Sequence, residues 1–333
     1  MARIITALTP NSMIATLCRI MCLVLGCCAG AACAFAQSYP SKPIRLLVPF
    51  PPGGSSDLVA RSISPKLGEL LGQPIIIDYK GGAAGSIGTA EAAKAPPDGY
   101  TVLIVWDTHA VNHHVYKVQY DFAKSFEPVT LLVQAPVMFV ANAAFPANTV
   151  KEVIDIARAK PGQVPLCIAG YGSSGHLAAL RFMDATGVQF NIVNYKGGGP
   201  LINDLIGGHV QVNFGSLPFV GEYVRGGKIK GIAVLANERS PAFPDLPPIT
   251  ETVPGLEAKT FFGLLVPAGT PKDIVARLNR EVVRTLADAQ TKERLVSRGF
   301  TVVGSSPEAF GEFLRQESEI TGRLVRAHHI VAE

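Results

Sequence analysis

Two distant stretches of the chain pass through the same order of short elements and turns. In the first, a strand pattern leads into Gly53-Gly54-Ser55-Ser56, a helical pattern, another strand, Asp78-Tyr79-Lys80-Gly81-Gly82, a helix and a third strand. The second repeats this order around the turns 170–175 and 194–198, with Gly207-Gly208 before its last strand. Chance similarity between glycine-rich loops is the alternative. The shared order and approximate spacing favour a repeated unit.

Strand and helix patterns alternate within each unit. Ile44-Arg45-Leu46-Leu47-Val48 has the character of a strand, residues 57–71 carry an apolar helical stripe, and Ile75-Ile76-Ile77 is again strand-like. This βαβ order predicts an α/β fold in which each unit is a mostly parallel sheet flanked by helices. Pro65 is expected to kink the helix that contains it. Two units predict two lobes.

The two lobes should be joined by extended segments. Pro136 to Val140 fits a strand that leaves the first lobe, and Phe261 to Val266 fits a strand that returns to it. We therefore expect a discontinuous lobe 1 of residues 39–140 plus 261–333. Lobe 2 would then comprise residues 141–260.

Two further helices are expected after the return strand. Thr270-Pro271 and Ser306-Pro307 each offer a hydroxyl N-cap followed by proline at the first helical position. Asp273 and Glu308 place negative charge in the first turns of these helices. We interpret their apolar faces as core packing of lobe 1 rather than as a partner surface.

Residues 1–36 are predicted to be a secretory signal peptide. Arg3 and Arg19 precede an apolar stretch, and Ala34-Phe35-Ala36 forms an A-x-A cleavage site, so cleavage would deliver the protein to the periplasm. An uncleaved membrane anchor and a lipoprotein modified at Cys27 are the alternatives. Met13 is an alternative start that would leave a leader of ordinary length.

The cysteines and charges narrow the remaining possibilities. Five of the six cysteines lie in the predicted leader, and Cys167 lies in an apolar strand pattern, so we interpret it as a core thiol. The net charge is only +4, and the basic residues are scattered without a basic run. A nucleic-acid partner is therefore not expected.

Two glycine-serine loops each follow a strand and open a helix. These are Phe50-Pro51-Pro52-Gly53-Gly54-Ser55-Ser56-Asp57 in the first unit and Gly172-Ser173-Ser174-Gly175 in the second. The first turn of a helix has unpaired N–H groups with partial positive charge, and glycine allows a ligand to approach the backbone. If the lobes face each other, the two loops converge on a small anion. An ordinary turn with a helix cap is the alternative for either loop alone.

Further short motifs recur along the chain in a characteristic order. They are Tyr39-Pro40 with Lys42-Pro43-Ile44, Pro52-Gly53-Gly54 with Asp57, Leu71-Gly72-Gln73-Pro74, Gly82-Ala83-Ala84-Gly85-Ser86-Ile87-Gly88, Pro97-Asp98-Gly99-Tyr100-Thr101, Tyr195-Lys196-Gly197, Asp204-Leu205-Ile206-Gly207-Gly208-His209-Val210 and Pro267-Ala268-Gly269-Thr270-Pro271. In this ordered set the chain resembles the solute receptors of tripartite tricarboxylate transporters, often called Bug-type receptors. The resemblance covers nearly the whole chain after the leader.

The resemblance implies a two-lobed periplasmic-binding-protein fold, similar to type II, with the ligand cleft between the lobes. It implies a binding protein rather than an enzyme, with no cofactor, no metal and no essential cationic side chain. A small organic carboxylate would be the ligand, recognised largely by backbone amides and ordered water. Membrane permease subunits would be the partners of a monomeric receptor.

The resemblance also implies which residues contact the ligand, by their positions in the shared motifs. They are Phe50, Gly53, Gly54, Ser55, Ser56, Asp57, Gly85 and Ser86 in lobe 1, and Ser173, Ser174, Gly175, Tyr195, Lys196, Phe214 and Gly215 in lobe 2. Tyr195-Lys196 fits a surface turn equally well.

The chain departs from the family after the strand that ends at Val105. The family usually has small residues before a Thr-His pair, whereas this chain has Trp106-Asp107-Thr108-His109. We add Trp106 and Thr108 to the candidate contacts. The indole would stack on a flat ligand, and Asp107 would meet a ligand amine or repel a second acid group. A Trp that packs between loops beside a solvated Asp is the alternative.

The sequence allows three alternative functions to be compared with a transport receptor. His109, His113 and His114 lie close together, but no H-E-x-x-H signature is present, so a metal enzyme is poorly supported. Gly172-Ser173-Ser174-Gly175 is not G-x-S-x-G, which disfavours a serine hydrolase. A sensory receptor would use the same cleft and closure, and the sequence does not separate it from a transport receptor.

Overall fold

The computed structural model describes residues 39–331 of the 333-residue chain. Residues from Lys42 onward form one compact unit, and those up to Ser41 belong to a separate one. The predicted signal peptide, residues 1–36, lies outside the described residues. No helix in the described part of the chain has the length and apolar character needed to cross a bilayer.

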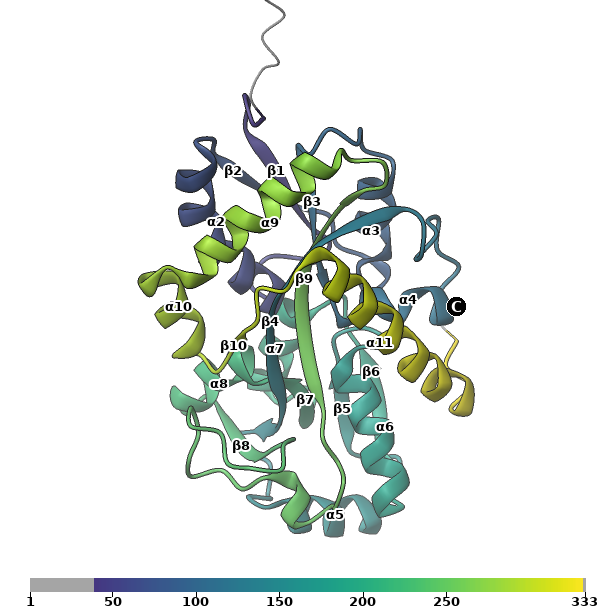
Figure 1. Cartoon of the computed structure of the whole chain (residues 1–333). Coiled ribbons are helices and arrows are strands. Elements are labelled where there is room, and N and C mark those ends of the chain that lie inside the picture. The colour runs from purple at the N-terminus through teal and green to yellow at the C-terminus, as the bar shows by residue number, and fades with distance from the viewer. Residues whose placement is uncertain (1–38, 332–333) are drawn as a thin grey trace, which may run out of the picture. The chain divides into compact units, whose positions relative to one another are not determined.

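The first sheet is built around three parallel strands. Strands β1 (Ile44–Val48), β2 (Ile75–Tyr79) and β3 (Thr101–Trp106) lie in the order β2-β1-β3. Strand β9 (Lys259–Pro267) pairs antiparallel with β3, and β4 (Phe126–Asn142) pairs antiparallel with β9. We call this sheet with its helices lobe 1 (upper part of Figure 1).

The second sheet repeats this arrangement. Strands β5 (Pro165–Ile168), β6 (Asn191–Asn194) and β7 (Val212–Ser216) are parallel, in the order β6-β5-β7. The far end of β4 lies antiparallel between β7 and β8 (Ile229–Val234). We call this part lobe 2 (lower part of Figure 1). The repeated unit predicted from the sequence is thus present as two sheets with matching strand order.

Strand β4 is shared by the two sheets. Residues 126–136 pair with β9, and residues 137–142 pair with β7 and β8. The segment Pro136 to Val140, predicted to leave lobe 1, is the part of β4 where its partners change. The residue boundaries predicted for the lobes stay a prediction, because the unit from Lys42 onward is not divided further.

Helices cover both faces of each sheet (Figure 1). Their bounds, with the last short strand, are α2 Ser55–Leu71, η1 Ala83–Gly85, α3 Ser86–Ala93, η2 Asp107–Ala110, α4 Asn112–Val115, α5 Val150–Ala159, α6 Ser174–Thr186, α7 Gly198–Gly207, α8 Leu217–Arg225, η3 Ile249–Glu251, α9 Lys272–Ala287, α10 Ala289–Val296, β10 Thr301–Val302 and α11 Pro307–Ala327. Pro65 lies inside α2, which continues past it to Leu71.

One of the two predicted caps is formed. Ser306 Oγ accepts a hydrogen bond from the Ala309 N–H, with Pro307 at the start of α11. Thr270 does not cap α9, which has Pro271 at its N-cap position. The Thr270 hydroxyl instead donates to the Pro267 carbonyl oxygen at 2.7 Å, so it holds the turn after β9 rather than the helix end.

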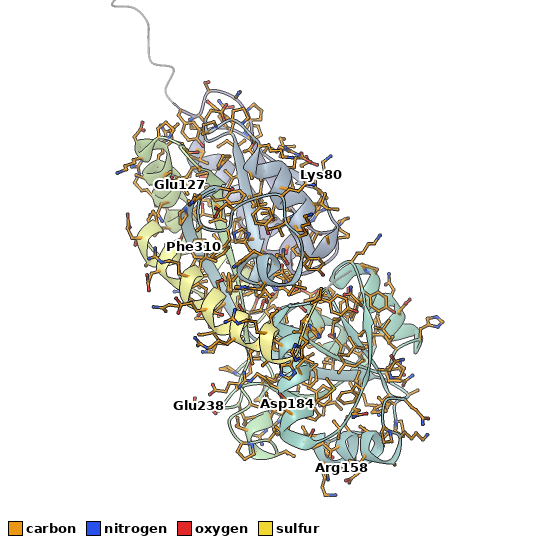
Figure 2. All side chains as sticks on the ribbon, turned by 90° about the vertical axis from the view of Figure 1, so that its right-hand side faces the viewer. Lys80, Glu127, Arg158, Asp184, Glu238 and Phe310 are labelled. Atoms are coloured by element: carbon orange, nitrogen blue, oxygen red, sulfur yellow. The ribbon has the colours of Figure 1, made fainter. Side chains whose placement is uncertain are left out.

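Helix α11 belongs to lobe 1 by its first turns and reaches lobe 2 at its end. Phe310 is fully buried in the lobe 1 core (Figure 2). Val325, near the end of the helix, packs with Leu177 of α6. His328 Nε2, at the C-cap, lies 3.0 Å from Asp184 Oδ2 of α6. Cys167, predicted as a core thiol, is fully buried on β5, and burial raises its pKa to about 12.

Candidate ligand-binding site

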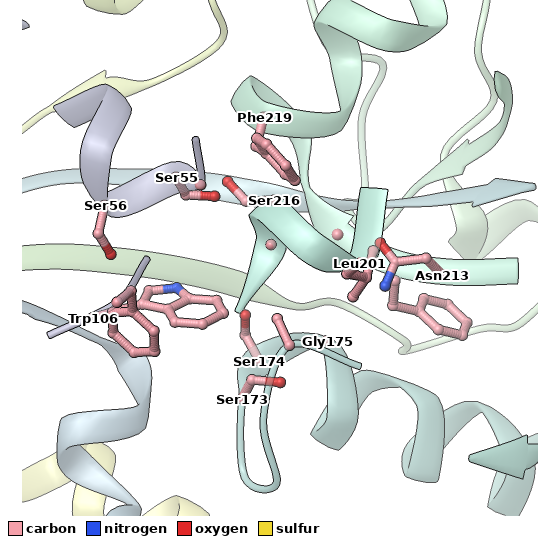
Figure 3. A pocket seen from close by; sticks show the side chains of 16 residues that line it. Ser55, Ser56, Trp106, Ser173, Ser174, Gly175, Leu201, Asn213, Ser216 and Phe219 are labelled. Atoms are coloured by element: carbon pink, nitrogen blue, oxygen red, sulfur yellow. The ribbon is translucent and has the colours of Figure 1, made fainter. Parts of the chain in front are cut away.

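A small pocket lies between the two lobes (Figure 3). Its lining comes from loops and helix starts at the ends of the parallel strands, which is where α/β sheets form ligand sites. The lining residues are Phe50, Gly54, Ser55, Ser56 and Trp106 from lobe 1, and Ala169, Ser173, Ser174, Gly175, Gly198, Leu201, Asn213, Phe214, Gly215, Ser216 and Phe219 from lobe 2. Among the described residues, no charged side chain belongs to this lining.

The start of α2 forms the lobe 1 side of the pocket. Gly54 is the N-cap in an extended conformation, and no side chain caps the helix. Gly53, with φ of +84°, adopts the left-handed conformation that glycine allows, and its N–H donates to Asp57 Oδ2 at 2.8 Å. Ser55 and Ser56 therefore begin the helix at the pocket wall, with their N–H groups at its positive end.

Two helix starts of lobe 2 complete this anion-attracting region. Ser216 is the N-cap of α8 and Gly197 is the N-cap of α7, and neither helix has a side-chain cap. Within residues 39–331, the buried Ser216 hydroxyl has no hydrogen-bond partner. Ser216 and Ser55, which come from different lobes, both line the pocket (Figure 3). A buried hydroxyl without a partner is costly unless a ligand or water satisfies it.

At the start of α6, on the opposite wall, two N–H groups are already bonded to protein groups. The Ser173 hydroxyl accepts from the His176 N–H at 3.3 Å. The Ser174 N–H donates to Asp107 Oδ1, also at 3.3 Å, although Asp107 comes from lobe 1. The positive end of α6 thus faces an internal carboxylate.

Asp107 is held by a short buried network behind the pocket wall. Thr260 Oγ1–H donates to Asp107 Oδ2 at 2.6 Å, and the Trp106 Nε1–H donates in turn to Thr260 Oγ1. Burial is the main cause that raises the pKa of Asp107 to about 7, while hydrogen bonds from Ser174 and Thr260 oppose the rise. Asp107 is therefore buried rather than solvated.

The indole of Trp106 forms one apolar wall. Its ring is parallel to Phe262, with centroids 6.4 Å apart, and meets Phe50 edge-on at 5.2 Å. Trp106 is only 8% exposed, so it both packs between elements and borders the pocket (Figure 3). The packing of Trp106 between elements is present in the structure, although beside a buried Asp107 rather than a solvated one, and stacking of the indole on a ligand stays a prediction.

The lobes touch at the pocket rim. A Cβ at Gly54 would lie 3.7 Å from Gly198 N, and one at Gly199 would lie 2.8 Å from the Pro52 carbonyl oxygen. The contact at Gly199 requires glycine, because a Cβ there would clash with the Pro52 carbonyl oxygen, whereas a Cβ at Gly54 would be in ordinary contact. The structure is therefore a closed arrangement of the two lobes.

Ten of the candidate contact residues line the pocket, and seven do not. Those in the lining are Phe50, Gly54, Ser55, Ser56, Trp106, Ser173, Ser174, Gly175, Phe214 and Gly215. Those outside it are Gly53, Asp57, Gly85, Ser86, Thr108, Tyr195 and Lys196.

Several residues outside the lining have contacts of their own. Asp57 accepts from Gly53 and Arg61, and from the Tyr79 hydroxyl at 2.5 Å, which shapes the loop from behind. The Tyr195 hydroxyl donates to Asp204 Oδ2 at 2.6 Å, and Lys196 is exposed.

Gly85 packs against Phe50, which lines the pocket. A Cβ on it would come within 2.9 Å of the Phe50 ring. Ser86 and Thr108 are buried next to these elements.

Six lining residues were not predicted as contacts: Ala169, Gly198, Leu201, Asn213, Ser216 and Phe219. A signal for Ser216 was present, since Ser216-Leu217-Pro218 after a strand has the pattern of an N-cap with proline in the first turn. Leu201 and Phe219 carry no such signal, because their position depends on how α7 and α8 pack.

The histidines considered for a metal site pack among aromatic rings. His109 is buried beside Tyr120, Phe122 and Phe126, and burial lowers its pKa to about 3. His113 stacks on Phe122. No group of three or more potential metal ligands occurs within residues 39–331.

Lobes of parallel sheet, a shared crossing strand and helix starts that meet in an interlobe pocket define the class of periplasmic binding proteins. Comparison with known proteins identifies the family. Residues 59–330 match the family described as "Tripartite tricarboxylate transporter family receptor". The chain therefore belongs to this receptor family, as its sequence motifs predicted.

Three relatives illustrate the similarity. Protein BugT of Bordetella pertussis is 33% identical over 300 residues, which cover 89% of this chain and 92% of BugT. The solved structure of the periplasmic binding protein BugD is 33% identical, with a TM-score of 0.85 over 88% of this chain and 100% of BugD. R. palustris Rpa4515, solved with adipate, is 33% identical, with a TM-score of 0.84 over 87% of this chain and 98% of that chain.

Proposed function

We propose that this protein binds a small organic carboxylate in the periplasm and delivers it to the permease subunits of a tripartite transporter. The observation that carries the proposal is the meeting of uncapped helix starts in one interlobe pocket. Helices α2, α7 and α8 each begin there without a side-chain cap. Their N–H groups are suited to an acid group that brings its own acceptors.

The electrostatics of the pocket favour an anion without a cationic side chain. Each helix start contributes about 0.3–2 kcal/mol to a nearby negative charge, so three starts together supply useful affinity. The unpaired Ser216 hydroxyl is available to donate to the same group. Solvent exclusion by the closed lobes strengthens each of these interactions.

The family relationship supports the same function. Rpa4515, which shares the fold over nearly its full length, was solved with the dicarboxylate adipate. We propose that the ten candidate residues in the lining, together with Ser216, contact the ligand of this chain. Closure would be a hinge motion about the strands that cross between the lobes, with the ligand holding the closed state.

We propose that the protein binds its ligand without transforming it. The His176 Nδ1 atom accepts from the Gly172 N–H, so it is not placed as a base for Ser173 or Ser174. Cys167 is fully buried, with a raised pKa, which is opposite to the requirement for a nucleophile. We further propose that the leader is cleaved after residue 36 and that the receptor is a monomer.

A carboxylate panel tests the proposed function. Thermal unfolding of the mature protein would be measured with monocarboxylates, dicarboxylates and tricarboxylates, with matching amides as controls. A ligand present at about 100 times its Kd stabilises the folded state by about 2.7 kcal/mol, which is a clear shift in Tm. Isothermal titration would then give the Kd of each hit. A chain that no carboxylate stabilises, or that the amides stabilise equally, would refute the proposal.

A further inference from the structure

The two helix starts that face each other across the pocket differ in what they leave for a ligand. At α2 no side chain caps the helix, and Ser55 and Ser56 open it at the pocket wall. At α6 the Ser174 N–H donates to Asp107 and the His176 N–H donates to Ser173. The α2 wall therefore has no side-chain cap, whereas on the α6 wall the first N–H is bonded to a carboxylate of the protein and the third to the Ser173 hydroxyl.

Asp107 is fixed in this position from both sides. One carboxylate oxygen accepts from Ser174 of α6, and the other accepts from Thr260 of β9. The side chain is 7% exposed and borders the neighbouring groove rather than the pocket itself. The place that a ligand acid group would take at the start of α6 is therefore occupied by the carboxylate of Asp107.

Within residues 39–331, no cation forms a hydrogen bond or ion pair with Asp107. Thr260 and Ser174 donate hydrogen bonds to it, and the charge of Glu317 of α11 adds to its own. The groove that Asp107 borders is also lined by the cations Arg181 and Lys259 and by Glu257. Like charges in a buried site repel strongly because little solvent screens them. This end of the site therefore disfavours negative charge.

The pocket lining combines hydroxyl and amide side chains with an apolar face formed by Trp106, Leu201 and Phe219. Trp106 is oriented by its hydrogen bond to Thr260 and by its parallel contact with Phe262. Leu201 and Phe219 border the pocket from lobe 2, and the indole extends toward Ser174 (Figure 3). Such an apolar face contacts a planar hydrocarbon ligand well.

We infer that the pocket selects monocarboxylates with a flat apolar body, with Asp107 and Trp106 as the residues that set this specificity. The acid group lies at the starts of α2, α7 and α8, and the body lies against Trp106. A second carboxylate at the far end is rejected by Asp107. This inference rests on the proposed function, because it names the class of carboxylate bound at the same site.

The test uses pairs of acids that share a carbon skeleton and differ by one carboxylate: benzoate with terephthalate, butyrate with succinate, and hexanoate with adipate. Titration of the wild-type protein should give a tighter Kd for the monoacid in each pair that binds, by about tenfold or more. That factor corresponds to one unit of pKa coupling between neighbouring charges. Benzoate should be the tightest of the three monoacids.

The variant Asp107→Asn removes the negative charge of this side chain and keeps nearly the same shape. Asparagine keeps an acceptor for the Ser174 N–H and removes the negative charge. The ratio of the terephthalate Kd to the benzoate Kd should fall by about tenfold, because a change in closure affects both ligands and the lost charge affects only the diacid. If the variant does not fold, the wild type provides the same comparison by pH. The preference for the monoacid should shrink on going from about pH 8.5 to about pH 5.5, where Asp107 gains a proton while both ligands stay ionised.

The possible results separate selectivity for monocarboxylates from the proposed receptor function. Diacids that bind the wild type as tightly as their monoacids would overturn the inference and leave the receptor function intact. A preference that persists unchanged in Asp107→Asn, or at low pH when only the wild type is folded, would exclude Asp107 as its cause. Failure of every acid in the panel to bind would instead refute the proposed function.

Discussion

Asp107 of lobe 1 and Ser174 of lobe 2 are hydrogen-bonded across the lobes: the Ser174 N–H donates to Asp107 Oδ1 at 3.3 Å. The bond joins the loop after β3 to the first residue of α6, so it can form only when the lobes are closed. Asp107 thus links the electrostatics of the pocket to the arrangement of the lobes. The variants below separate these two roles from overall stability.

Substitutions at Gly54 test close approach to the α2 start. A Cβ at this position would be in ordinary contact, 3.7 Å from Gly198 N, but the two γ carbons of valine have no such space. Gly54→Val should weaken carboxylate binding by about tenfold or more, whereas Gly54→Ala should bind within about threefold of wild type. Calorimetric titration, with circular dichroism to establish folding, gives the answer. Equal affinity of the two variants would contradict the proposed site.

A matched pair of glycines in α7 tests closure. A Cβ at Gly199 would lie 2.8 Å from the Pro52 carbonyl oxygen of lobe 1, whereas a Cβ at Gly207 meets only the His209 side chain, 3.2 Å away. Both Gly→Ala changes improve helix propensity, by up to about 1 kcal/mol, so neither should lower Tm. Only Gly199→Ala should reduce ligand affinity and the ligand-induced compaction seen by small-angle scattering. If Gly207→Ala lost the same affinity and compaction, impaired closure would not explain the effect of Gly199→Ala.

Ser216→Ala should weaken binding without weakening the fold. Its hydroxyl is buried and unpaired in the absence of ligand, so its removal should leave Tm unchanged or raise it. Carboxylate affinity should fall by about 0.5–1.5 kcal/mol, the usual worth of one hydrogen bond. Ser173→Ala provides the contrast, since loss of the N-cap bond to His176 should lower the stability of the free protein by about 1 kcal/mol. A lower Tm in Ser216→Ala would argue for a structural role.

The pH dependence of stability should carry opposing contributions. Burial raises the pKa of Asp107 to about 7, so its protonated form is favoured in the folded state. Its contribution is largest below the ordinary carboxyl pKa of about 4 and is lost as the pH rises to about 7. Burial lowers the pKa of His109 to about 3 and of His113 and His176 to about 4. Their contributions are present above about pH 6.5 and are lost on acidification.

Asp107→Asn isolates the carboxyl group from the histidines. In wild type the three histidines should outweigh Asp107, so Tm should fall between about pH 6.5 and about pH 4. The variant lacks the stability that Asp107 contributes when it is protonated, so its Tm should fall more steeply. The Tm of wild type minus that of the variant should therefore increase as the pH is lowered. Thermal scans of both proteins from about pH 8 to about pH 5 measure this difference. A difference that is constant with pH would mean that Asp107 does not titrate in this range.

Local signals in the sequence accounted for most elements around the site. The turn Gly53-Gly54-Ser55-Ser56 and the turn before α6 were both recognised, because helix starts depend on residues next to each other in the chain. The same reasoning was wrong for Thr270, whose hydroxyl bonds to Pro267 rather than to the start of α9. A hydroxyl can accept from a helix-start N–H or donate to a nearby carbonyl oxygen, and the local pattern does not rank these two roles.

By itself, the sequence determined that this protein has two α/β units, that each opens a helix with a glycine-serine turn, and that a strand joins the lobes. These properties follow from residue periodicity and from backbone conformations set within a few positions. Only the tertiary structure decided that α7 and α8 begin in the same pocket and that Asp107 turns away from it toward Ser174 and Thr260. Such positions depend on the register of β3 against β9 and on how the lobes close, which are contacts between residues far apart in the chain.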